Sequence, residues 1–129
     1  MSHRILVIED NDANMELVTD LLEAAGFSVY PAATGEQGLR AAEAIAPDLI
    51  LMDLSLPGLD GLATTRALRR HPATSHLPIV ALTAHAMKGD QEIALAAGCN
   101  GYLTKPIDTR TFVSSVSAWL TDANEPQFT

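Results

Sequence analysis

Short apolar segments alternate with segments of helical spacing along the whole chain, and this alternation constrains the fold more than any other feature. Most of the short segments are continuously apolar, with few polar residues between the apolar ones. Continuous apolarity is typical of strands that are covered on both faces, as in a parallel sheet. The predicted strands are residues 5–8, 27–30, 49–52 and 79–82, with a shorter fifth strand at 101–103.

The segments between these strands carry helix signals. Thr34 followed three residues later by Gln37 is a capping box, and Gly26 is a typical C-terminal stop. Asp60 and Asp108 are placed to cap two later helices. The expected helices cover about 15–25, 35–46, 61–70 and 87–97, and the last one carries apolar residues between 112 and 120.

Strand and helix therefore follow each other five times, which predicts an α/β domain with a parallel sheet and right-handed crossovers. The chain has 129 residues, 47% of them hydrophobic, which suits one globular domain with a substantial core. We expect this domain to cover residues 1–121, followed by a polar C-terminal tail at 122–129.

The charge of the chain is strongly acidic and uneven. The formal net charge is −8, and residues 1–60 contain most of the acidic side chains. Such a charge disfavours binding to nucleic acid or to an anionic membrane, because both would repel the protein. Three arginines, Arg66, Arg69 and Arg70, fall on one helical face, which we expect to be solvated.

Signals for export or membrane insertion are not found in the sequence. Cys99 is the single cysteine and has no partner for an internal disulfide. The apolar segment at 5–8 ends at Glu9, which is too early for a signal peptide, and no apolar run approaches the length of a membrane span. We therefore expect a cytoplasmic protein.

Polar side chains follow the inner strands at the points where these strands end. Glu9 and Asp10 follow the first strand, Asp53 the third, Thr83 the fourth and Lys105 the fifth. Ligands of open parallel sheets bind at this edge. Three carboxylates repel one another and favour Mg²⁺, and a carboxylate beside a hydroxyl and an ammonium suits phosphoryl transfer through an aspartyl phosphate.

Several short motifs surround these strand ends. They are Ile5-Leu6-Val7-Ile8-Glu9-Asp10-Asn11, Asp48-Leu49-Ile50-Leu51-Met52-Asp53, Leu56-Pro57-Gly58 with Asp60-Gly61, Pro78-Ile79-Val80-Ala81-Leu82-Thr83-Ala84, Ala86-Met87-Lys88-Gly89-Asp90, Gly98-Cys99 and Gly101-Tyr102-Leu103-Thr104-Lys105-Pro106. In these motifs the sequence resembles the receiver domains of two-component response regulators, and especially the single-domain cell-division regulators of the DivK type. The resemblance covers about residues 4–120 and implies a (βα)5 fold, a doubly wound five-stranded parallel sheet of the flavodoxin-like type.

This resemblance implies a role for each matching residue. Asp53 matches the phosphoacceptor, and Asp10, Asp53 and the backbone carbonyl of Ser55 match Mg²⁺ ligands. Glu9 matches a neighbouring acid that reaches the metal through water. Phosphoryl-binding groups are implied at Thr83, the Ala84 backbone and Lys105, whose bond to Pro106 is expected to be cis.

The resemblance also implies how the signal is passed on. Thr83 and Tyr102 match a coupled switch, and Ser55 and His85 match positions that tune the phosphoryl lifetime. The implied partners are a histidine kinase or histidine phosphotransfer protein and a downstream protein, with the chain a monomer or a weak phosphorylation-dependent dimer. The candidate partner surface consists of His85, Ala86, Met87, Lys88 and Tyr102.

Two other functions remain open from the residues themselves. The first is a phosphatase with an aspartyl nucleophile, but such an enzyme needs a general acid two residues later, where this chain has Ser55. The second is a flavodoxin-like electron carrier, although the acidic loop at 9–12 would repel a flavin phosphate. The resemblance favours a signalling domain that catalyses at most its own phosphorylation and dephosphorylation.

Overall fold

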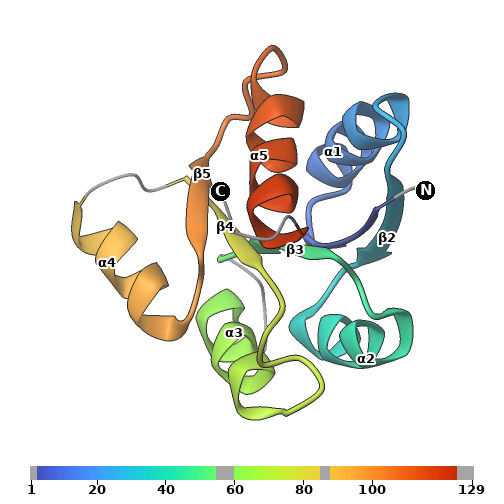
Figure 1. The fold of residues 1–129 in the computed structure, drawn as a ribbon. Coiled ribbons are helices and arrows are strands. Elements are labelled where there is room, and N and C mark those ends of the chain that lie inside the picture. Colours follow the sequence, from blue (N-terminus) through green and yellow to red (C-terminus); the bar gives the residue numbers. More distant parts are fainter. Residues whose placement is uncertain (1–2, 55–59, 85–87, 125–129) are drawn as a thin grey trace, which may run out of the picture.

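A computed structural model of the chain describes residues 3–54, 60–84 and 88–124. Its five strands form one parallel sheet in the order β2-β1-β3-β4-β5, with five helices around it (Figure 1). The predicted α/β class and all five predicted strands are confirmed. The strands are β1 (Arg4–Ile8), β2 (Ser28–Ala32), β3 (Leu49–Asp53), β4 (Ile79–Thr83) and β5 (Gly101–Thr104).

The helices cover both faces of the sheet (Figure 1). Side chains of α1 and α5 pack with one set of strand residues, and side chains of α2, α3 and α4 pack with the alternate set. Every residue of β3 and β4 is buried, which explains why these strands read as continuous apolar runs. The helices are α1 (Asp12–Ala24), α2 (Gly35–Ile45), α3 (Gly61–Arg70), α4 (Lys88–Ala97) and α5 (Phe112–Asn124).

Polar side chains start three of the helices. Asn11 caps α1, Thr34 caps α2 and Asp60 caps α3, each accepting a hydrogen bond from a backbone N–H three residues later. The Gln37 side chain accepts from the N–H of Ala33 at 2.8 Å, one residue before the cap. The predicted caps at Thr34 and Asp60 are confirmed, and they fix where α2 and α3 leave the sheet.

The last helix starts later than the sequence predicts. The Asp108 side chain accepts from the N–H of Arg110, and its carbonyl accepts from Thr111 and Phe112, so Asp108 begins a turn and the helix starts at Phe112. Helix α5 continues to Asn124. The domain boundary at residue 121 stays a prediction. None of the helices in the described ranges is long and apolar enough to cross a membrane.

The predicted solvated face of α3 is wrong for Arg69. Arg66 and Arg70 are exposed, but the Arg69 guanidinium turns back onto the protein. It donates to the carbonyls of Gly98 at 2.9 Å and Leu77 at 2.6 Å, and to the side chain of Asn100 at 2.8 Å. Arg69 thereby ties the end of α3 to the start of β4 and to the connection between α4 and β5.

Gly101 lies where β5 meets α5. A Cβ atom at this position would overlap the six-membered ring of Trp119, so the close approach requires glycine. We expect Gly101→Ala to lower the free energy of unfolding by about 1–3 kcal/mol, because Trp119 must leave its packed position. Urea unfolding followed by the fluorescence of Trp119, the single tryptophan, measures this change.

The matched control is Gly89→Ala in α4, where an added Cβ meets no atom within 4 Å. This substitution should be neutral or stabilise by up to about 1 kcal/mol, since alanine favours helix more than glycine does. Equal unfolding midpoints for the two variants would show that Trp119 moves aside at no cost.

Candidate functional site

The parallel sheet brings the predicted site residues to one edge. Glu9 directly follows β1, Asp53 is the last residue of β3, Thr83 is the last residue of β4, and Lys105 directly follows β5. Glu9, Asp53 and Thr83 are buried, whereas Asp10 is exposed. The Lys105 N–H also donates to the Thr83 carbonyl at 2.8 Å, which extends the pairing of β4 and β5 to the lysine.

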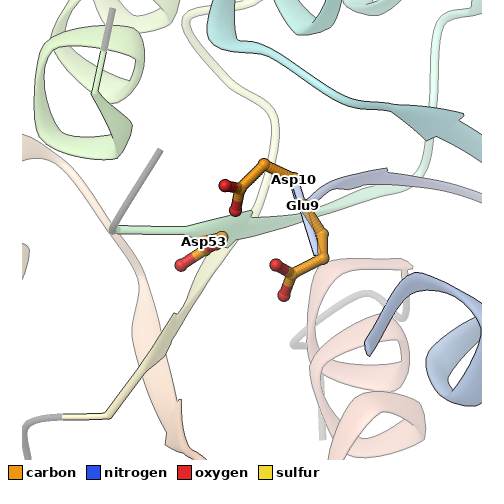
Figure 2. A group of neighbouring side chains, drawn as sticks. All are labelled: Glu9, Asp10 and Asp53. Carbon is orange, nitrogen blue, oxygen red and sulfur yellow. The ribbon is translucent and has the colours of Figure 1, made fainter. Parts of the chain in front are cut away.

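Three carboxylates meet at this edge. Glu9 and Asp10 come from the end of β1 and turn toward Asp53 on β3 (Figure 2). One oxygen of each residue can be chosen so that all three atoms lie within 4.8 Å of one another. Like charges this close repel strongly, and a cation relieves the repulsion. The cluster is therefore a candidate cation site made only of oxygen donors.

Lys105 supplies a positive charge next to this cluster. Its ammonium lies 2.9 Å from Oε1 of Glu9 and 3.3 Å from Oδ1 of Asp53. The bond between Lys105 and Pro106 is cis, as expected from the family resemblance. Lys105 thus contacts two of the three carboxylates from the end of β5, across the intervening β4.

The backbone around the acids fixes their positions. The N–H of Glu9 donates to the Ala32 carbonyl at 3.0 Å, and Oε2 of Glu9 accepts from the N–H of Asn11 at 3.1 Å. Gly61, the first residue of α3, lies against the backbone of Asp53, because a Cβ there would overlap the Asp53 carbonyl oxygen. The motif that contains Gly61 does not predict this contact, and the available signal is a glycine directly after a helix cap.

Burial and neighbouring charges shift two pKa values at the site. Burial raises the pKa of the Glu9 carboxyl above its usual range, and the Asp53 carboxylate adds to this, while Lys105 and the Asn11 N–H oppose it. Burial lowers the pKa of Lys105, but the two carboxylates outweigh it, so this pKa is raised. The site therefore favours the charged form of Lys105 and disfavours the charged form of Glu9 when no further cation is present.

The predicted switch and partner residues lie partly within the described structure. Tyr102 is half-buried, packs against the core on the face covered by α2, α3 and α4, and pairs in register with Ala81. Ala84 is exposed at the end of β4. Lys88 begins α4. Ser55, His85, Ala86 and Met87 lie outside the described residues.

The donor set fits a hard divalent cation. Carboxylate oxygens are preferred ligands of Mg²⁺, which binds through one or two carboxylates and keeps several waters. Asp10 is exposed and can face such a hydrated ion, while Asp53 lies at the buried side of the cluster. The residues present are therefore compatible with Mg²⁺.

Comparisons with known proteins agree with this arrangement. The polar-differentiation response regulator DivK of Brucella ovis is 40% identical over 123 residues, which are 95% of this chain and 100% of that protein. The receiver domain of a Pseudomonas aeruginosa sensor histidine kinase, solved with a magnesium ion in its active-site cleft, is 39% identical with a TM-score of 0.85. This comparison covers 93% of this chain and 98% of that chain.

A two-component response regulator from Clostridium difficile has a TM-score of 0.88 at 26% identity and covers 96% of this chain and 100% of that chain. The sequence pattern of the response regulator receiver domain matches residues 5–117. This range includes the three acids of the cluster, the strand-end threonine and the lysine, which are Glu9, Asp10, Asp53, Thr83 and Lys105. Because a family match over most of the chain agrees with a full-length relative, the chain belongs to the response regulator receiver domain family, whose general function is phosphorylation-dependent signalling.

Proposed function

We propose that this receiver domain accepts a phosphoryl group from a phosphohistidine onto Asp53. The observation that carries the proposal is the pairing of the buried Asp53 carboxylate with the Lys105 ammonium at 3.3 Å, at the edge where the sheet also gathers Glu9 and Asp10. A carboxylate so placed can act as a nucleophile, and the ammonium can neutralise charge on an incoming phosphoryl oxygen.

The transfer exchanges one bond to phosphorus for another. An Oδ atom of the Asp53 carboxylate forms a bond to phosphorus, while the bond between phosphorus and the donor imidazole nitrogen breaks and its electron pair stays on the imidazole. Burial of Asp53 limits competition by water. Thr83, at the end of the neighbouring strand, and the Ala84 backbone are our candidates to bind the phosphoryl oxygens after transfer.

We assign the Mg²⁺ ligands to the carboxylates of Asp10 and Asp53 and to the backbone carbonyl of Ser55, with Glu9 as an acid that reaches the metal through water. The bound ion would neutralise negative charge on the phosphoryl group and on the cluster. The fit of the three carboxylates to an oxygen-liganded cation supports this assignment.

Phosphorylation then biases a switch between two conformations. New bonds from Thr83 and Lys105 to the phosphoryl group favour the state that binds the partner. Tyr102, which is half-buried on the strand beside Thr83, is our candidate for the coupled switch. We propose that Tyr102 and residues 85–88 form the surface for a downstream protein or the next member of a phosphorelay, and that Ser55 and His85 tune the phosphoryl lifetime.

The acceptor assignment predicts one phosphoryl addition. Wild-type protein incubated with Mg²⁺ and acetyl phosphate should gain the mass of a single phosphoryl group, and Asp53→Asn should gain none, because an amide cannot form the acyl phosphate. Intact-protein mass spectrometry measures both. The matched control is Asp20→Asn on the exposed side of α1, which should be modified like wild type.

Other outcomes of the same experiment would contradict the assignment. An equal mass gain in Asp53→Asn would place the phosphoryl group elsewhere. Continuous turnover of a phosphate ester would indicate a phosphatase, and a yellow purified protein would indicate a flavin carrier.

The metal assignment predicts a thermal shift. Mg²⁺ at about 100 times its dissociation constant should stabilise the fold by about 2.7 kcal/mol, because the folded state alone gathers the three carboxylates. A chelator should reverse the shift in Tm, and Asp10→Asn should remove most of it. Asp12→Asn, two residues along in exposed sequence, should keep it. Equal loss in both variants would mean that general acidity, not a ligand set, binds the ion.

The raised pKa of Glu9 predicts a specific pH dependence in metal-free protein. The folded state holds the Glu9 proton more tightly than the unfolded state, whose pKa is near the ordinary 4.5. Wild type should therefore lose stability relative to Glu9→Gln as the pH rises from about 4.5 through the folded-state pKa, with a slope of at most about 1.4 kcal/mol per pH unit. Above that pKa the difference should stay constant.

Urea unfolding of both proteins with a chelator present, at a series of pH values, gives this difference directly. The raised pKa would be contradicted if the difference in free energy of unfolding between wild type and Glu9→Gln stays constant from about pH 4.5 upward. It would also be contradicted if wild type gains stability relative to Glu9→Gln over that range.

A further inference from the structure

We propose that Glu9 is a positioning residue for Lys105, holding the ammonium beside Asp53. The inference rests on the proposed function, since it concerns how Lys105 is placed for phosphoryl transfer to Asp53. It gives Glu9 a role in addition to the water-mediated metal contact assigned above.

Distance and burial connect Glu9 to Lys105. The ammonium lies 2.9 Å from Oε1 of Glu9 and 3.3 Å from Oδ1 of Asp53, so Glu9 is the nearer of its two carboxylate partners. The side chain of Glu9 has 0% exposure, against 18% for Lys105. A fully buried carboxylate needs a compensating charge, and Lys105 supplies it.

The two oxygens of Glu9 have separate surroundings. Oε2 accepts a hydrogen bond from the N–H of Asn11, which is itself the cap of α1. The start of α1 thereby holds one oxygen of the carboxylate. Oε1 is buried and has no hydrogen bond of good geometry within the described residues, and the ammonium is its ion-pair partner.

The two roles of Glu9 can use different oxygens. The ammonium lies 2.9 Å from Oε1, whereas Oε2 accepts one hydrogen bond from the N–H of Asn11 and keeps a second lone pair that a metal-bound water can use. Asp10 is in a different situation, because it is exposed and can face a hydrated ion. Glu9 is thus the buried carboxylate that holds the ammonium, and Asp10 is the carboxylate that faces solvent.

The ion pair between Glu9 and Lys105 has a consequence for phosphoryl transfer. Lys105 stays tethered to Glu9 while its second contact passes from Asp53 to an oxygen of the arriving phosphoryl group. Removal of the Glu9 charge should therefore leave the ammonium of Lys105 free to turn away from Asp53. Phosphorylation should then be slower even when Mg²⁺ saturates the metal site.

A double-mutant cycle separates the two roles. The rate of phosphorylation by acetyl phosphate at saturating Mg²⁺ is measured for wild type, Glu9→Gln, Lys105→Met and the double variant. We expect Glu9→Gln alone to slow the reaction about tenfold relative to wild type. Added to Lys105→Met, it should slow the reaction less than about twofold relative to Lys105→Met. Glu16→Gln, the same change at an exposed position of α1, should match wild type in both backgrounds.

The opposite pattern overturns the proposal. If Glu9→Gln slows the reaction by the same factor with and without Lys105, Glu9 acts on the metal or on the fold and not through the lysine. A wild-type protein that takes up no phosphoryl group would instead contradict the proposed function. In that event a second measurement, described next, still tests the pairing of Glu9 with Lys105.

That second measurement observes the ammonium directly. The sequence contains two lysines, Lys88 and Lys105, so a protein labelled with ¹⁵N at lysine Nζ gives two ammonium resonances. In metal-free wild type near pH 6, the Lys105 resonance should be protected from exchange with water, and Glu9→Gln should abolish this protection. The Lys88 resonance is the internal reference, and Glu16→Gln should leave the Lys105 resonance protected. A Lys105 resonance that is unprotected in wild type, or unchanged in Glu9→Gln, overturns the proposal.

Discussion

Three carboxylates with oxygens within 4.8 Å of one another, at the edge of an apolar sheet, stay ionised together only if positive charge compensates them. Lys105 provides one compensating charge through its contacts with Glu9 and Asp53. Three carboxylates against one ammonium leave an excess of two negative charges, which is the charge of one Mg²⁺. The acidity of the first half of the chain is thus partly a property of this cluster, and the remainder lies on exposed helix surface such as Glu16 and Asp20.

The rest of the fold serves to hold these charges where they are. Strands β3 and β4 are buried along their full length between two helical layers, so the residues at their ends have little freedom. The start of α3 packs against the backbone of Asp53, and the cap of α1 holds the carboxylate of Glu9. The proposed phosphoryl transfer requires rigid strand ends with fixed neighbours, because preorganised groups need not reorganise during the reaction.

Periodicity in the sequence predicted the elements, since hydrophobic pattern and caps are local signals. Thr34 and Asp60 marked helix starts correctly for this reason. Contacts between distant segments leave no such local signal. Arg69 looked like part of a solvated stripe, yet its guanidinium binds carbonyls that follow it by 8 and 29 residues. The fit of Gly101 against Trp119 was equally hidden, because a glycine in a strand does not say which side chain approaches it.

The same distinction applies to the candidate site. The order of strand ends was enough to bring Glu9, Asp53 and Lys105 to one edge, because parallel strands end together. It could not say which carboxylate the lysine approaches. Glu9 and Asp10 are adjacent in the chain and both turn toward Asp53 (Figure 2), yet Glu9 is buried and Asp10 is exposed. Their neighbours then differ: Glu9 meets the lysine, and Asp10 meets solvent and any hydrated cation. A pair of acids that looks redundant in the sequence is thereby divided into two different physical environments.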